Sequence, residues 1–111
     1  TIDEQDIFNV TINESLAVAL LTNLLKNAFV HNIDGGHIRI TVTKNSITFR
    51  NSGVENPLDK EHIFERFYQG TKKEGSTGLG LAIADSICRL QHLSIRYYFE
   101  QKEHCFEISR Q

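Results

Sequence analysis

The longest periodic pattern in the chain predicts a helix over residues 16–31. Apolar residues recur there at helical spacing, which places them on one face of the helix. The main row consists of Leu16, Leu20, Leu24 and Ala28. Asn13 or Ser15 would cap the start of this helix, because a short polar side chain can accept a bond from the first free amides. A turn rich in glycine at residues 32–36 ends it.

Alternation of apolar and polar residues predicts the strands. The alternating segments are residues 5–12, 38–42, 47–50, 93–99 and 106–108. Lys44-Asn45 forms a tight hairpin turn between two of them, and residues 101–103 form another. A second helix is predicted over residues 78–90, with Asp85 and Arg89 one turn apart on its exposed side.

The order of these elements is strand, helix, hairpin, long connection, helix, hairpin. It predicts an α/β fold of one domain, residues 1–111, in which helices pack on one face of a mixed sheet of about five strands. The connection over residues 51–77 contains no long periodic element, only one short helical piece around residues 59–67. A connection of this length in a small domain is usually functional or mobile.

Composition narrows the class of protein. The chain has 111 residues, of which 40% are hydrophobic, and a net charge of -2, so it can form one core and lacks the basic character of a nucleic-acid binder. It has no apolar run long enough to span a membrane. Cys88 and Cys105 show no metal or redox spacing, which indicates a reduced cytosolic setting, with Cys88 in the helix core and Cys105 at a strand position. Because the first residue is Thr1, we expect a fragment of a longer protein.

A glycine-rich loop precedes the second helix. Residues 75–83 read GSTGLGLAI, with three glycines within six positions. Glycines let the backbone approach a ligand closely, and the start of a helix presents free amides and a partial positive charge to it. The loop therefore predicts a phosphate-binding site, with an ordinary turn as the alternative.

Polar residues interrupt the first helix at a spacing of four: Asn23, Asn27 and His31. They form a stripe beside the leucine row. Asparagine is a poor helix former, so two of them weaken the helix unless they serve a function. An amide oxygen suits Mg²⁺, which takes its other ligands from water and substrate phosphates. The alternative is a solvated helix face.

Two further segments carry candidate binding residues. Asn51-Ser52-Gly53 ends a predicted strand, where a polar side chain could hold a base, although a simple turn explains it equally. Residues 63–68 form an aromatic and charged cluster that either serves the site or anchors the long connection to the body. Cations in this region that could reach phosphates are Arg66, Lys72 and Lys73.

These segments together resemble the motifs of bacterial sensor histidine kinases. The run LTNLLKNA at residues 21–28 resembles their asparagine box, FERFY at residues 64–68 their phenylalanine box, and residues 75–83 their second glycine box. The three occur in the family's order and spacing and cover nearly the whole chain. The glycine loop alone would also fit the wider superfamily of gyrases, heat-shock chaperones and mismatch-repair ATPases, whereas the phenylalanine box indicates the kinases.

The resemblance implies a two-layer α/β sandwich of Bergerat type that binds ATP with Mg²⁺ under a mobile lid at residues 54–77. Asn27 would be the Mg²⁺ ligand, with Asn23 supporting it, and Asn51 would accept a hydrogen bond from the amine of adenine. Asn23, Asn27 and Arg66 would be the catalytic residues. The other residues that the resemblance implies in cofactor binding are His31, Gly53, Lys72, Lys73, Thr77, Gly78, Leu79, Gly80 and Leu81.

The chain also departs from the family pattern. Asn51 replaces an aspartate, and Glu55 replaces a glycine of the first glycine box. Asn51 brings no charge, and its amide donors could oppose the adenine amine, so weaker adenine binding is expected. Val30 and Gln69 stand where the family often has basic residues. The negative charge of the phosphates would then be neutralised by the metal and by Arg66, Lys72, Lys73 and His31.

The resemblance implies phosphoryl transfer to a histidine on a separate dimerisation domain, followed by a response regulator. Related ATPases place a glutamate at the position of Asn23 to activate water, and asparagine cannot act as that base, so transfer is favoured over hydrolysis. None of the five histidines lies in a phosphoacceptor motif, so the fragment alone should not autophosphorylate. We expect most of the five to lie at the surface. The five are His31, His37, His62, His92 and His104.

Two alternatives remain at this point. The weakened adenine end would suit a degenerate module that senses nucleotide without kinase activity, and a protein-serine kinase of the same superfamily is also compatible with the glycine loop. The expected partners are ATP or ADP and the parent's own phosphoacceptor domain, without nucleic acid or direct membrane contact. The domain is expected in the cytoplasm, with a parent that is an inner-membrane sensor as one possibility.

Overall fold

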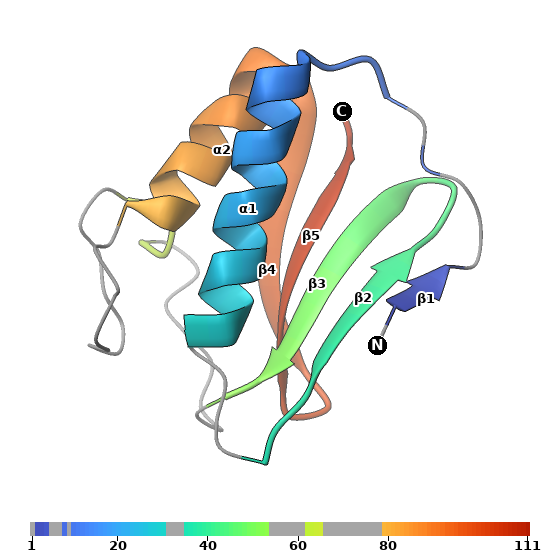
Figure 1. Ribbon diagram of the computed structural model, residues 1–111, viewed down its shortest axis with the longest axis vertical. Helices are drawn as coiled ribbons and strands as arrows, with labels where there is room; N and C mark the ends of the chain where they lie inside the picture. The colour runs from blue at the N-terminus through green and yellow to red at the C-terminus, as the bar shows by residue number, and fades with distance from the viewer. Residues whose placement is uncertain (1, 5–7, 9, 31–34, 54–61, 66–78) are drawn as a thin grey trace.

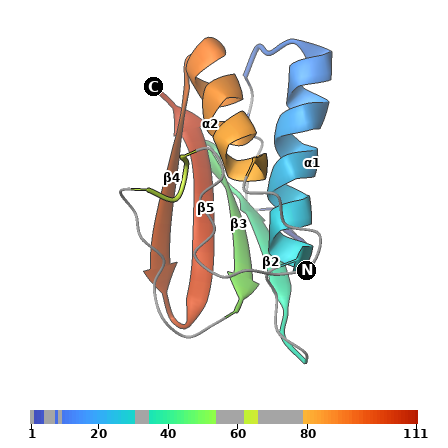
Figure 2. The same ribbon diagram turned by 90° about the vertical axis from the view of Figure 1, so that its left-hand side faces the viewer.

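Two layers make up the molecule, a sheet and a pair of helices that cover one of its faces (Figures 1 and 2). The computed structural model describes residues 2–4, 8, 10–30, 35–53, 62–65 and 79–111. Its elements are β1 (Ile2–Glu4), α1 (Glu14–Val30), β2 (Ile38–Val42), β3 (Ser46–Ser52), α2 (Gly80–Leu90), β4 (Leu93–Glu100) and β5 (Glu103–Arg110). The predicted α/β sandwich is therefore confirmed.

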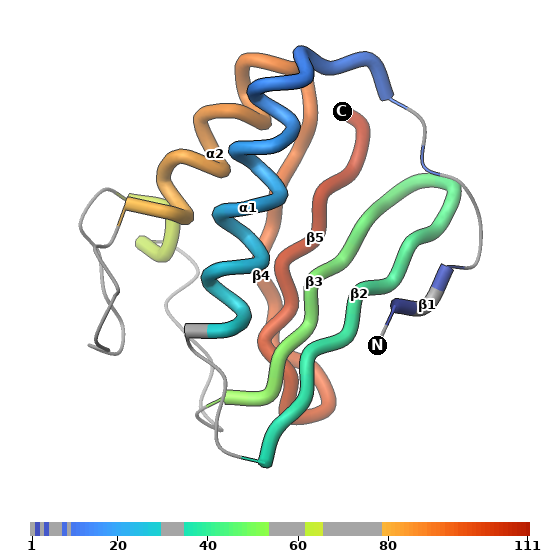
Figure 3. Tube along the Cα trace, viewed as in Figure 1, coloured from blue at the N-terminus to red at the C-terminus, as the bar shows by residue number. Residues whose placement is uncertain are grey.

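The sheet is mixed, with strand order β1-β2-β3-β5-β4. β1 runs parallel to β2, while the pairs β2–β3, β3–β5 and β4–β5 are antiparallel. The path of the chain in Figure 3 shows how the two hairpins lie side by side, so that the ends of β3 and β4 and the start of β5 meet at one end of the sheet. This end carries the residues that concern the candidate site.

The first helix begins earlier than its apolar row. The amide of Leu16 donates to Oδ1 of Asn13 at 3.2 Å, and the amide of Ala17 donates to the Asn13 carbonyl at 2.9 Å. Asn13 is thus the capping residue, and Ser15 lies inside the helix. The cap satisfies amides that have no partner within the helix.

The prediction of a strand over residues 5–12 is wrong where the structure describes this segment. β1 ends at Glu4, and residues 8 and 10–12 are not in a strand. Val10 and Ile12 instead pack against the core as the chain passes from the sheet to α1. An extended connection whose side chains contact the core alternately has the same sequence period as a strand, although it does not pair with a neighbouring strand.

The last hairpin is tighter than expected. Gln101 and Lys102 have positive φ values of 53° and 63°, which is the conformation of a two-residue hairpin turn. Glu103, expected in the turn, already pairs with Glu100 as the first residue of β5. Every residue from Glu103 onward therefore has a fixed place on one or the other face of the sheet.

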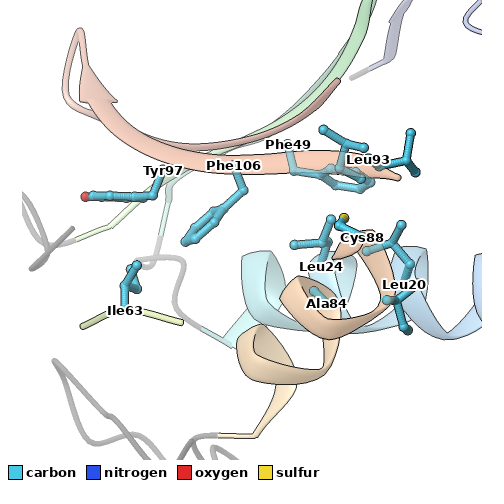
Figure 4. Close-up of a cluster of buried hydrophobic side chains, with 11 residues drawn as sticks. Leu20, Leu24, Phe49, Ile63, Ala84, Cys88, Leu93, Tyr97 and Phe106 are labelled. Atoms are coloured by element: carbon cyan, nitrogen blue, oxygen red, sulfur yellow. The ribbon is translucent and has the colours of Figure 1, made fainter. Parts of the chain in front are cut away.

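The core lies between the two layers (Figure 4). Leucines of α1 and small residues of α2 face large side chains from the sheet. The buried apolar residues drawn there include Leu20, Leu24, Ala84, Cys88, Phe49, Leu93, Tyr97 and Phe106. Cys88 is 1% exposed in this core, and Cys105 is 0% exposed on strand β5, which confirms the predicted helix-core and strand positions of the two cysteines. No helix among the described residues is long and apolar enough to cross a membrane.

The described part of the long connection is anchored to this core. Residues 62–65 form a turn in which Ile63 is buried and the Phe64 ring meets the edge of Phe106 at a centroid distance of 6.2 Å. The start of the phenylalanine-box cluster therefore pins the connection to the body. The remainder of the predicted helical piece at residues 59–67 lies outside the described residues.

Candidate functional site

Helix α1 meets the start of α2 at Asn23. The Asn23 side chain is half-buried, and its Nδ2 donates to the carbonyl of Ala19 at 2.7 Å. A carbonyl can only accept, so the NH₂ group must face Ala19 and Oδ1 must be the other amide atom. A Cβ built on Gly80 would lie 3.2 Å from this Oδ1. The structure thus brings the asparagine stripe against the last glycine of the loop.

The N-terminus of α2 faces the same place without a side-chain cap. Leu79 occupies the cap position with φ -106° and ψ -28° and makes no capping bond through its side chain. Its carbonyl accepts the amide of Ile83 at 2.9 Å, which starts the helical ladder. The amides before Ile83 have no acceptor within the helix, and the helix dipole adds positive charge there. An anion such as phosphate fits this end.

Asn27 follows one turn after Asn23 on α1 and is half-buried. No cluster of three or more His, Cys, Asp or Glu side chains able to hold a metal occurs among the described residues. A metal here would therefore depend on the amide oxygen of Asn27, on water and on ligand phosphates. This donor set suits Mg²⁺, which keeps several waters and binds phosphate oxygens.

At the other end of the site, Asn51 lies near the end of β3 and is 2% exposed. Its Nδ2 donates to the carbonyl of Ser52 at 2.9 Å. This bond fixes the orientation of the amide, because the carbonyl can accept but cannot donate. One N–H of Asn51 is thereby directed at the backbone, and Oδ1 is the atom suited to accept a hydrogen bond from a ligand amine.

A polar network on the opposite face of the sheet holds this end of β3. The Ser52 hydroxyl accepts the His37 amide at 2.8 Å and donates to the His37 carbonyl at 3.2 Å. The buried carboxylate of Glu103 lies 2.7 Å from Nε2 of His37 and accepts Nη2 of Arg39 at 2.9 Å. β2, β3 and β5 are thus tied together directly behind Asn51.

His104 lies next to Asn51, as its direct partner in the β3–β5 register. It is 4% exposed, whereas His37, His62 and His92 are exposed, so most of the histidines lie at the surface as expected and His104 is the exception among the described ones. The strand period provides the reason, since His104 shares a strand face with Phe106 and Ile108. The alternation of His104, Phe106 and Ile108 along the strand is the sequence signal that indicates this burial.

Several predicted site residues fall outside the described part of the chain. They are His31, Arg66, Lys72, Lys73, Thr77 and Gly78. The same holds for Glu55, Gln69 and the predicted lid at residues 54–77, apart from residues 62–65. Gly53 is buried directly after β3, and the Leu81 side chain packs against the core.

Residues 12–109 match the family described as histidine kinase-, DNA gyrase B-, and HSP90-like ATPase. The chain belongs to this family. Within it, 84 residues are 43% identical to sensor histidine kinase RppB of a Synechocystis species, covering 68% of this chain and 18% of that protein. Heme sensor protein HssS of Staphylococcus aureus is 39% identical over 90 residues, covering 77% of this chain and 20% of HssS. The chain thus spans about a fifth of the length of these relatives.

Solved structures confirm the fold of this histidine kinase-type ATPase domain. The catalytic domain of histidine kinase ThkA superposes with a TM-score of 0.80 at 25% identity, covering 96% of this chain and 74% of that one. The mycobacterial sensor histidine kinase MprB superposes with a TM-score of 0.76 at 20% identity, covering 98% and 83%. The resemblance of the three motif boxes to sensor histidine kinases is therefore confirmed at the level of family, ATP-binding domain and fold.

Proposed function

We propose that this domain binds Mg²⁺-ATP and presents the γ-phosphate to a histidine on a separate dimerisation domain of the same parent protein. The observation that carries the proposal is the approach of Asn23 to Gly80. It brings Asn23 of α1 close to the first residue of α2, which supports a site shared by the asparagine stripe and the N-terminus of α2. Family membership supports ATP as the nucleotide.

Each end of the site has a role in this proposal. Asn27 ligates Mg²⁺ and Asn23 supports it from the preceding turn, while the backbone of Leu79, Gly80 and Leu81 receives the phosphates. Asn51 accepts the adenine amine through Oδ1, with Gly53 giving the base room. The remaining proposed contacts to the phosphates come from His31, Arg66, Lys72, Lys73, Thr77 and Gly78.

The proposed reaction is in-line transfer. A ring nitrogen of the partner histidine would form a bond to the γ-phosphorus while the bond to the bridging oxygen breaks and ADP leaves. Mg²⁺ held by Asn27 would supply positive charge to the phosphates. Asn23 cannot take a proton from water, so it does not promote hydrolysis. A response regulator then takes the phosphoryl group from the histidine. The catalytic steps depend on positioning and charge, which the proposed site residues supply.

Calorimetric titration with ATP, with and without Mg²⁺, tests the assignment. We expect Asn27→Ala to abolish most of the gain in affinity that Mg²⁺ brings, because a direct ligand is lost. Thr22→Ala, at an exposed position of the same helix, is the matched control and should behave as the unaltered protein. Equal Mg²⁺ dependence in all three proteins would contradict the proposed metal site.

One observation favours a second function. The adenine end carries a neutral Asn51 where the family has a charged aspartate, which suits a module that senses nucleotide without transferring phosphate. Mixing the domain with the parent's dimerisation domain and labelled ATP separates the two. Acid-labile label on the dimerisation domain supports the histidine kinase, acid-stable label indicates a serine kinase, and ATP binding without transfer indicates the sensing module.

A further inference from the structure

A hydrogen bond joins the two helices at the end of the pair that lies away from the candidate site. The backbone amide of Asn13, which caps α1, donates to Oε1 of Gln91 at 3.1 Å. Gln91 is the C-cap of α2, so the bond links the start of one helix to the end of the other. The helices lie side by side and run in opposite directions (Figures 1 and 2). The start of α2 therefore lies beside the middle of α1, where Asn23 approaches Gly80.

Both partners in this bond are held by the ends of their own helices. Oδ1 of Asn13 accepts the amide of Leu16 at 3.2 Å, and the Asn13 carbonyl accepts the amide of Ala17 at 2.9 Å. The amide of Gln91 donates to the carbonyl of Ile87 at 3.0 Å, which fixes its backbone on the last turn of α2. A hydrogen bond between two groups held in this way limits how far α2 can move along α1.

The bond and the approach of Asn23 to Gly80 lie at matched places on the two helices. A helix rises about 1.5 Å per residue, so Asn13 and Asn23 are about 15 Å apart along α1. Gly80 and Gln91 are about 17 Å apart along α2 by the same measure. A slide of α2 along α1 therefore changes the distance between Asn13 and Gln91 together with the distance between Asn23 and Gly80.

The side chains that α2 buries give little resistance to such a slide. Three of its four buried residues have short side chains. The four are Ala82, Ala84, Ile87 and Cys88. Short side chains form shallow ridges, which interlock less with the grooves of a neighbouring helix than long side chains do. Packed helices shift by about 1–2 Å in many conformational changes, and a Cβ atom on Gly80 would lie only 3.2 Å from Oδ1 of Asn23.

We propose that Gln91 is a positioning residue for the phosphate end of the site. Its bond to Asn13 sets the axial position of α2 against α1, and thereby the place of the α2 N-terminus relative to Asn23. The inference rests on the proposed function, in which this helix end receives the phosphates. Gln91 acts on the nucleotide from the far end of α2, without touching it.

Removal of the acceptor tests this role. Affinity for Mg²⁺-ATP is measured by calorimetry for the unaltered protein, Gln91→Met and Gln91→Glu. Methionine keeps the length of the side chain without the amide oxygen, so we expect binding roughly three- to tenfold weaker, the worth of one hydrogen bond. Glutamate keeps an acceptor for the Asn13 amide and should restore part of the affinity.

Gln111→Met is the matched control, because it removes a bond from a glutamine side chain to the backbone outside the helix pair. Nε2 of Gln111 donates to the carbonyl of Leu93, the first residue of β4, at 3.2 Å. The loss of this bond should leave the affinity for Mg²⁺-ATP unchanged.

A double variant separates positioning from a general loss of order. Gly80→Ala and Gln91→Met alter residues about 17 Å apart along α2, so independent effects on affinity would multiply. If Gln91 sets the position of α2, its loss lets α2 slide and relieves the crowding at Asn23. The double variant should then bind more tightly than the product of the two single losses. Unchanged affinity in Gln91→Met, or losses that multiply, would overturn the inference and leave the proposed function standing. If the unaltered protein does not bind Mg²⁺-ATP, the proposed function is overturned together with the inference.

Discussion

The side-chain oxygen of Asn23 lies 3.2 Å from the point that a Cβ atom on Gly80 would occupy. Real Cβ atoms rarely come this close to another atom, so any side chain at Gly80 must displace the amide. The amide in turn is held by its bond to the Ala19 carbonyl. The Asn23 side chain therefore limits which residue can stand at position 80.

Gly80→Ala should weaken Mg²⁺-ATP binding with little change in the stability of the domain. Alanine is a better helix former than glycine by up to about 1 kcal/mol, which offsets the crowding at Asn23, so the free energy of unfolding should change by less than about 1 kcal/mol. The displaced amide should weaken Mg²⁺-ATP binding about tenfold, the cost of one lost or distorted polar contact. Urea unfolding and calorimetry measure the two quantities.

Ser86→Ala is the control for this change, because Ser86 is exposed in the second half of the same helix. It should affect neither affinity nor stability by a measurable amount. Unchanged ATP affinity in Gly80→Ala would show that the approach of Asn23 to Gly80 has no part in binding.

Asn51→Asp should change stability and affinity in opposite directions. In the unliganded protein, a carboxylate oxygen would replace the NH₂ group that donates to the Ser52 carbonyl, which sets two acceptors against each other in a buried place. We expect a loss of about 1–3 kcal/mol in the free energy of unfolding. With ATP, the added charge strengthens the bond to the adenine amine and should raise affinity about tenfold.

Thermal unfolding with and without saturating ATP shows both effects in one experiment. Asn45→Asp, in the exposed hairpin turn, adds the same charge away from the site and should leave both melting temperatures close to those of the unaltered protein. A variant Asn51→Asp that is as stable as the unaltered protein without ATP would mean that the bond to Ser52 does not hold the amide.

Glu103→Gln should loosen the end of the sheet that carries Asn51. The Glu103 side chain is 4% exposed and contacts both His37 and Arg39, so the loss of its charge weakens two contacts at a buried group. We expect a loss of about 1–3 kcal/mol in the free energy of unfolding, measured in urea.

The matched control for this carboxylate lies on the same strand. Glu107 accepts Nε of Arg96 at 2.6 Å, but the arginine side chain is 66% exposed, and such pairs contribute little. Glu107→Gln should therefore cost less than about 1 kcal/mol. Equal losses in the two variants would contradict the assignment of Glu103 as the residue that ties β2, β3 and β5.

The parts of this domain that the sequence predicts well are those in which one local rule decides the outcome. Helical spacing places Leu20 and Leu24 in the core, and α2 begins at Gly80, two residues after its predicted start. Asn23 and Gly80 are far apart in sequence, and only the resemblance to a family brought them together. Their proximity depends on tertiary packing that no local pattern contains.

The burial of two polar residues was not predicted from the sequence, and both cases have the same physical cause. Glu103 and His104 are polar residues at the start of a strand, where composition favours a turn or a surface. Their burial follows from the two-residue turn before them, which sets the register, and from partners on β2 and β4. A polar residue is buried when others satisfy its hydrogen bonds, and those partners are distant in sequence.

The two buried thiols should make the domain lose stability at high pH. Burial raises the pKa of Cys88 to about 11, with Asp85 adding to the effect. Burial likewise raises the pKa of Cys105 to about 11, against the nearby charge of Arg50, which lowers it. In the unfolded chain a thiol has a pKa of about 8.5.

Between about pH 9 and pH 11 the folded protein therefore keeps protons that the unfolded chain releases, so each rise in pH favours unfolding. We expect the urea midpoint of unfolding to fall as the pH rises through this window. Below this window the thiols are protonated in both states, so they should not change the midpoint. Cys88→Ala and Cys105→Ala should each reduce the slope against pH, whatever their effect on the midpoint at pH 7. Burial also raises the pKa of Tyr98, so this residue contributes a loss of stability in the same direction. The contribution of each thiol is therefore the difference in slope between its variant and the unaltered protein. A slope that neither substitution changes would mean that the buried thiols do not control the loss.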